Sequence, residues 1–166
     1  MNTAIAFTNL TVVQMLIEAK ADVNLADTGS TSPGDTPLHS AASKNLPSDA
    51  SYVKTILDAK ASINARTLKG KNAVTCAAAS NSVAALKLLL HSGGEISPLL
   101  PANEYTPFWN TPLLSAALSP AYSLAQDKDD GKIEELPLRR EACTLLISHG
   151  ASPSEFTKHG VKMPAF

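Results

Sequence analysis

The chain has 166 residues, of which 44% are hydrophobic and 17% charged, and its formal net charge is −1 at pH 7. This length fits one domain, or four to five repeats of about 33 residues. A nucleic-acid-binding surface needs clustered basic residues, and a membrane span needs about 20 consecutive apolar residues. The sequence has neither pattern, so we expect no binding to nucleic acid and no insertion into a membrane.

Two short elements alternate along the chain. The first reads V-Q-M-L-I-E-A-K-A-D-V-N at 13–24. Related segments follow at 53–64, 86–97 and 143–154. The second reads D-T-P-L-H-S-A-A at 35–42, with altered copies at 71–78 and 110–117. Four copies of one element and three of the other, in alternating order, predict stacked repeating units.

Each element has the composition of one helix in a helix pair. In the second element, Thr36 is suited to cap a helix start, and Pro37 to the first helical position, where its missing N–H costs nothing. Its paired alanines, Ala41 and Ala42, allow neighbouring helices to approach closely. The first element carries the large apolar residues. A single helix pair cannot bury both sets, so we expect the units to stack.

Two departures from the pattern are expected to weaken the units locally. In the last copy of the first element, Gly150 lies just past the expected helix end, where a left-handed residue terminates a helix. Lys20 and Lys60 occupy this position in the first two copies, and a left-handed lysine costs roughly 1 kcal/mol relative to glycine. The segment 72–75 replaces T-P-L-H, so the third unit is predicted to lack both the helix cap and the proline.

The motif T-P-L-H-x-A at 36–41, together with the turn-like ending of the first element, resembles the ankyrin-repeat family. The resemblance covers nearly the whole chain. It implies an all-α ankyrin-repeat solenoid of stacked helix-turn-helix units, with hairpin-like turns and two long insertions at 98–110 and 119–138. The approximate units are 1–27, 28–67, 68–102 and 103–155, with 156–166 as a tail or the start of a truncated repeat. The incomplete first and last units fit either terminal caps or an excised piece of a larger protein.

No group of residues predicts catalysis. The resemblance gives His39 the structural role of a hydrogen bond that ties adjacent turns. His91 and His149 occupy matching helix ends, where a histidine faces the negative end of the helix dipole. No phosphate-binding loop, catalytic triad or set of metal ligands is recognisable from the spacing. We therefore expect a protein that is not an enzyme and that uses no cofactor or metal ion.

The two cysteines, Cys76 and Cys143, fall within apolar helical patterns and are expected to be buried, reduced thiols. A chain this poor in cysteine is typical of the cell interior. We therefore expect an intracellular, cytoplasmic protein. The sequence leaves the nucleus open as a location, and also a host cytosol if the protein is a bacterial effector.

The resemblance implies that the chain binds another protein through a concave face formed by the first helices and the turn tips. The candidate partner-binding residues are those that differ between copies on this face. They are Thr28, Ser40, Lys44, Leu68, Lys69, Ala79, Tyr105, Phe108, Trp109, Ser115 and Leu118, with Ser43 and Cys76 at related positions. Nothing in the sequence identifies the partner, and we expect the chain to be a monomer.

The insertion 98–110 contains the only tryptophan, Trp109, close to Tyr105 and Phe108. Large rings bury much area at a low cost in rotamer entropy, and they dominate binding hot spots. The alternative is that these rings pack under the loop as a satellite core. The sequence leaves open whether the two insertions bind a partner or only pack.

Asn24 has a separate interpretation, because the ending of the first element resembles sites where ankyrin asparagines are β-hydroxylated. Asn24 is therefore a possible hydroxylation site. The alternative is a turn residue whose side chain bonds its own backbone.

Two rival functions belong to other classes. The chain is either an accessory or targeting ankyrin domain of a larger enzyme or secreted bacterial effector, or a small enzyme in its own right. The second rival needs a pocket with converging titratable groups, and the sequence shows no such set.

Overall fold

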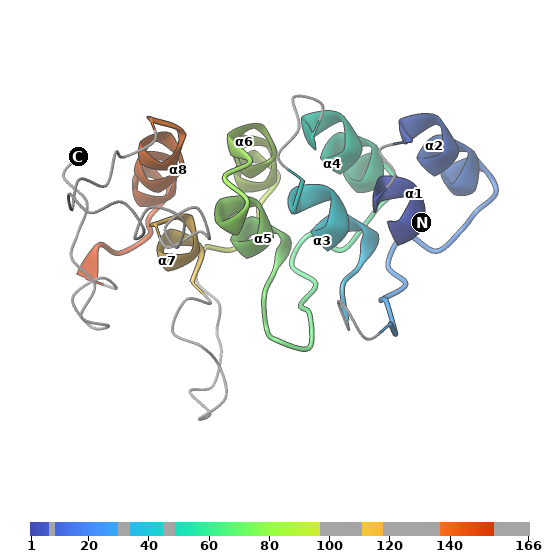
Figure 1. The fold of residues 1–166 in the computed structure, drawn as a ribbon, viewed down its shortest axis with the longest axis horizontal. Coiled ribbons are helices and arrows are strands. Elements are labelled where there is room, and N and C mark those ends of the chain that lie inside the picture. The colour runs from blue at the N-terminus through green and yellow to red at the C-terminus, as the bar shows by residue number, and fades with distance from the viewer. Residues whose placement is uncertain (7–8, 30–33, 45–48, 97–110, 118–136, 155–166) are drawn as a thin grey trace, which may run out of the picture.

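The computed structural model describes residues 1–6, 9–29, 34–44, 49–96, 111–117 and 137–154 (Figure 1). Within these ranges every regular element is a helix, as the sequence predicts. The helices are α1 (Asn2–Ala6), α2 (Leu10–Glu18), α3 (Pro37–Ala42), α4 (Asp49–Asp58), α5 (Ala73–Ala79), α6 (Val83–His91), α7 (Pro112–Ala117) and α8 (Pro137–Ser148). They form four consecutive pairs, each with a shorter helix followed by a longer one.

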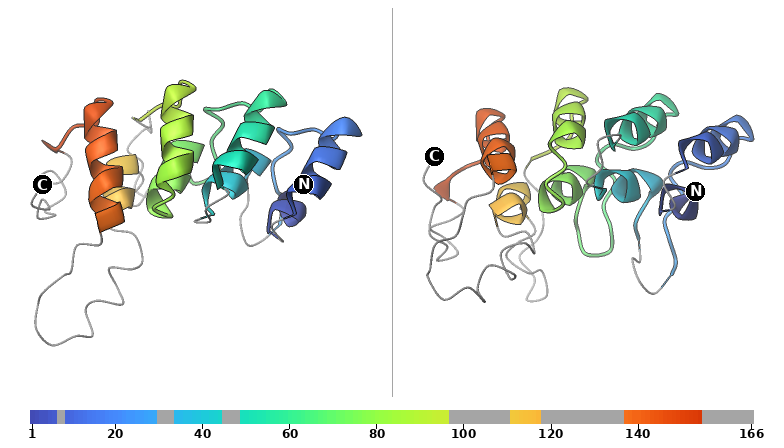
Figure 2. Two further views of the ribbon diagram at one scale, coloured as in Figure 1. Left: turned by 90° about the horizontal axis from the view of Figure 1, so that it is seen from above. Right: turned by 45° about the horizontal axis from the view of Figure 1, so that its top comes forward.

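The pairs stack side by side in two layers. The short helices α1, α3, α5 and α7 form one row, and the long helices α2, α4, α6 and α8 form the other (Figures 1 and 2). Each short helix packs against the long helix of its own pair and against the short helix of the neighbouring pair. The connections from α2 to α3 and from α4 to α5 extend beyond the short-helix row (Figure 1). This side of the stack is therefore formed by short helices and turns.

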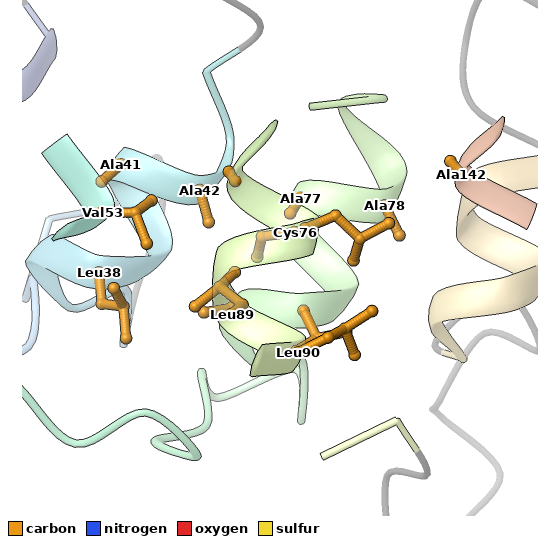
Figure 3. Packing of buried hydrophobic residues seen from close by; sticks show 14 of the residues in the cluster. Leu38, Ala41, Ala42, Val53, Cys76, Ala77, Ala78, Leu89, Leu90 and Ala142 are labelled. Carbon is orange, nitrogen blue, oxygen red and sulfur yellow. The ribbon is translucent and has the colours of Figure 1, made fainter. Parts of the chain in front are cut away.

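The core lies between the layers and between neighbouring pairs. Ala41, Ala42, Ala77 and Ala78 are fully buried, and their small side chains let α3 and α5 lie close together (Figure 3). The long helices supply the large side chains. Among those that are fully buried are Val13, Val53, Ile56, Leu86, Leu89 and Leu146. One buried cluster includes residues of every pair, so no pair has a core of its own.

The long helices end in the way that the sequence predicts. Lys20 has a φ of 60° and Lys60 a φ of 69°, while Gly93 has 89° and Gly150 has 101°. Each of these residues lies two positions past the last residue of its helix. The left-handed conformation of the two lysines is thus confirmed, and their Cβ atoms carry the strain that glycine avoids in the later units.

The prediction that the third unit lacks a helix cap is wrong. Asn72 is the N-cap of α5, because its Oδ1 accepts hydrogen bonds from the Thr75 N–H at 2.9 Å and the Thr75 hydroxyl at 2.8 Å. Its Nδ2 also donates to the carbonyl oxygen of Glu95 at 2.8 Å, across to the end of the same unit. Asparagine caps helices as well as threonine does, so only the proline is lost.

We expect Asn72→Ala to lower the free energy of unfolding by about 2–3 kcal/mol, because it removes both a cap and a buried bond to Glu95. Asn9→Ala is the matched control. Asn9 caps α2 through a 3.1 Å bond from the Val12 N–H on the exposed surface. Its removal should cost about 1 kcal/mol. Urea unfolding measures the free energy of unfolding of both variants. Equal losses of stability would show that the bond from Asn72 to Glu95 contributes nothing.

Candidate partner-binding surface

Two hairpins connect the first three helix pairs. In the first hairpin, the Asp27 N–H donates to the Asp35 carbonyl oxygen at 2.8 Å. In the second hairpin, the Thr67 N–H donates to the Lys71 carbonyl oxygen at 2.9 Å. These closures correspond to the hairpin-like turns that the sequence resemblance implies.

The two hairpins touch each other at Gly34. This residue has a φ of 86°, a conformation that favours glycine. A Cβ atom added to it would lie 2.6 Å from the backbone nitrogen of Leu68 and 3.0 Å from the Leu68 Cγ. The first hairpin therefore needs a glycine here both for its turn and for its contact with the second.

His39 joins the first of these turns to the second. Its Nδ1 lies 3.1 Å from the Thr36 backbone nitrogen and 2.9 Å from the Thr36 hydroxyl. Its Nε2 lies 3.0 Å from the Ala65 carbonyl oxygen and 3.2 Å from that of Lys71. Because the Thr36 N–H donates, Nδ1 must be the acceptor, so Nε2 carries the proton and donates to both carbonyls. The fully buried imidazole thus fixes the second hairpin to α3.

The titratable groups around His39 suit a structural role. Burial lowers the pKa of His39, against the opposing charge of Asp35 and the two carbonyl bonds. Burial also raises the pKa of Asp35. The pKa of Cys76 is raised to about 11 by burial and by the charge of Asp35. At neutral pH His39 is therefore neutral and Cys76 is a protonated thiol, which is a poor nucleophile.

Two asparagines form a second set of bonds between units. The Asn24 Oδ1 accepts from the Ser62 N–H at 2.7 Å, and the Asn64 Oδ1 accepts from the Glu95 N–H at 2.9 Å. The interpretation of Asn24 as a residue bonding its own backbone is therefore wrong for its side chain. The local bond is made by Asp22, whose Oδ1 accepts from the Asn24 N–H at 2.8 Å. Sequence reasoning missed the link, although asparagine at one position of two successive copies was a signal for it.

Most of the described candidate residues lie at or near the surface. Leu68 is 80% exposed at the second hairpin. Thr28, Ser43 and Lys69 are exposed, and Ser40, Lys44 and Ala79 are half-buried. The sequence did not single out one exposed apolar residue on this side. Leu25, at the base of the first hairpin, is 68% exposed.

The prediction that Ser115 and Cys76 belong to the binding surface is wrong, because their side chains are buried and they are only 6% and 8% exposed. They belong to α7 and α5, which make the most extensive contact between any two helices here. The remaining candidates, Tyr105, Phe108, Trp109 and Leu118, lie outside the described residues, so their contact with a partner stays a prediction.

Arg66 anchors the base of the second hairpin. Its Nη2 lies 2.9 Å from the Glu95 Oε2, and its Nη1 donates to the Gly70 carbonyl oxygen at 3.3 Å. The ion pair is partly exposed, so it adds at most about 1 kcal/mol of stability. Its main effect is geometric, since it joins the hairpin to the end of the third unit.

These features recur in a known family. The sequence model described as ankyrin repeats (3 copies) matches residues 1–99, which is more than half of the chain. The chain belongs to the ankyrin-repeat family. No curated protein matches it. Ankyrin repeats are generally protein–protein interaction modules, and the family is typically non-catalytic.

The described part of this ankyrin array also bears on three other features: reactive thiols, metal sites and membrane-spanning helices. Cys76 and Cys143 are both buried as reduced cysteines, as the sequence predicts. No three His, Cys, Asp or Glu side chains of the described ranges are grouped so that they could hold a metal ion. None of the helices described in this array is both long and apolar enough to cross a lipid bilayer.

His39 makes the stability of the ankyrin stack depend on pH. Its pKa is lowered on folding, so the unfolded chain binds more protons as the pH falls through about 6.5. The free energy of unfolding should therefore drop by up to about 1 kcal/mol between pH 7.5 and pH 6. Asp35 acts with the opposite sign, because the raised pKa of its carboxyl favours the folded state as the pH falls.

Urea unfolding at both pH values measures this drop. In His39→Gln the drop should shrink, and the variant should be less stable at pH 7.5 because the ties to Ala65 and Lys71 are lost. An undiminished drop in the variant would assign the pH dependence to other groups.

Proposed function

We propose that the chain is a non-catalytic module that binds a partner protein through its short-helix face, its two hairpin tips and its inserted loops. The observation that carries the proposal is that the second hairpin is fixed at its base and exposed at its tip. His39 and Arg66 hold the base, while Leu68 and Lys69 are exposed to solvent.

A fixed tip favours binding, because little conformational freedom is lost when it contacts a partner. Leu68 supplies apolar area for such a contact, and Leu25 adds more beside the first hairpin. Thr28 and Lys69, exposed in the same two hairpins, add a hydroxyl and an ammonium group to this surface. A few apolar anchors within a polar rim are typical of protein–protein interfaces.

The short-helix row provides the rest of the proposed surface. Ser40, Lys44 and Ala79 come from α3, the turn after it and α5, and all three are half-buried. The Lys44 Nζ donates to the Ala6 carbonyl oxygen at 3.0 Å, which joins the first two pairs along this row. We infer that the module acts as a monomer in the cytoplasm.

Leu68→Ser is expected to weaken partner binding by about tenfold or more while leaving stability nearly unchanged, because the side chain is exposed. The partner is first identified by pull-down and mass spectrometry from the native cell. Its dissociation constant is then measured with purified proteins.

Met15→Ser is the matched control for Leu68→Ser. Met15 is 60% exposed on α2, in the long-helix row. Its substitution therefore removes a similar apolar area from a part of the molecule outside the proposed surface. Its affinity should equal that of the wild type. Binding at the second hairpin would be contradicted if both substitutions weakened partner binding equally, or if neither weakened it.

The prediction for the first insertion is tested separately. If Phe108 and Trp109 contact the partner, the double variant Phe108→Ala/Trp109→Ala weakens binding, and the helical circular dichroism and the melting temperature stay as they are. Loss of helicity or a large drop in melting temperature would instead identify these rings as part of the core.

A further inference from the structure

Two histidines of successive units lie next to each other in the long-helix row. His91 is the last residue of α6, and His149 directly follows α8. Their ring centroids are 6.0 Å apart, with an angle of 63° between the ring planes. The two helices lie side by side in both orientations (Figures 1 and 2). The sequence pattern placed these residues at matching positions but gave no reason to consider them together.

Hydrogen bonds determine which nitrogen of each ring carries the proton. The His91 Nδ1 lies 2.7 Å from the Lys87 carbonyl oxygen, and the His149 Nδ1 lies 2.9 Å from the Leu145 carbonyl oxygen. A carbonyl oxygen only accepts, so each Nδ1 is the donor and each neutral ring keeps a lone pair on Nε2. Metal-binding histidines are oriented in the same way, by donating their other N–H to a carbonyl or carboxylate.

The separation of the rings fits a shared ion. With metal–nitrogen bonds of about 2 Å and a tetrahedral or somewhat wider angle, two imidazoles on one ion have centroids about 5–6 Å apart. The observed distance is 6.0 Å. Both side chains are exposed, so water has access to the remaining coordination positions.

The backbone around the pair also favours a cation. The C-terminal end of a helix carries a partial negative charge from its unpaired carbonyl groups. Here two such ends, those of α6 and α8, lie together at the two rings.

We propose that His91 and His149 bind one divalent transition-metal ion, such as Zn²⁺, Ni²⁺ or Cu²⁺, through their Nε2 atoms. Imidazole is a preferred ligand of all three ions. No group of three or more ligating side chains occurs in the described ranges, so water completes the coordination sphere and the ion exchanges with solution. Because each ligand comes from a different helix pair, the bound ion links the third and fourth units.

The test is a titration of the whole chain with NiCl₂ or ZnCl₂ at pH 7.5, followed by calorimetry and thermal melting. We expect one ion per chain and a melting temperature that rises with metal concentration, since a ligand of the folded state stabilises it. His91→Asn and His149→Asn should each weaken binding by about tenfold or more and abolish the rise. Mg²⁺ and Ca²⁺ should have no effect, because they prefer oxygen ligands.

His159→Asn is the matched control, and it should keep the wild-type affinity. Each variant is also melted without metal, to check that its fold is intact. We expect unchanged melting temperatures, because in each case an exposed ring is replaced by a polar side chain. Paramagnetic broadening by Ni²⁺ should affect the ring signals of His91 and His149 before those of the other histidines. Undiminished metal binding in the combined variant His91→Asn/His149→Asn, or no melting shift of the wild type in millimolar Zn²⁺, would overturn the proposal and leave two rings that only pack.

Discussion

None of the helices in the described part of the chain is long enough to be stable by itself, and this constraint governs the rest of the structure. The described helices have between 5 and 12 residues, whereas isolated helices of that length are marginal in water. A single pair cannot close a core either, because Ala41, Ala42, Ala77 and Ala78 are fully buried in one cluster that includes residues of every pair. Apolar surface is removed from water only when the pairs stack, so stability arises between units as much as within them.

Polar side chains give this stacking its register. His39, Asn24 and Asn64 each reach from one unit to backbone groups of the next. Apolar contacts tolerate sliding, whereas a hydrogen-bonding group loses its partner when the units shift, and this loss is most costly for the fully buried His39 ring. The His39 bonds also hold the base of the second hairpin in place, so a residue that sets the register also supports the proposed binding surface.

The sequence was sufficient for the repeat fold, since the fold depends on local patterns that recur. The alternating elements predicted the helices, and the turn positions of Lys20 and Lys60 predicted their left-handed backbone. Apart from His39, the sequence did not predict which side chains form hydrogen bonds with residues of other units. The cap formed by Asn72 was missed because it was compared with the motif letter by letter, although its amide offers the same acceptor as threonine. The burial of Ser115 depends on how α7 packs against its neighbouring helices, which no single unit encodes.

The stacking of α7 and α8 has a consequence for how such a chain can change. These helices pack against each other although residues 118–136 separate them in the sequence. The entropic cost of closing a loop grows only with the logarithm of its length, by about 0.6 kcal/mol for each doubling. Segments between helices can therefore lengthen with little loss of stability, whereas segments within helices cannot. The array can acquire new recognition sequences at its connections while the spacing of its units stays constant.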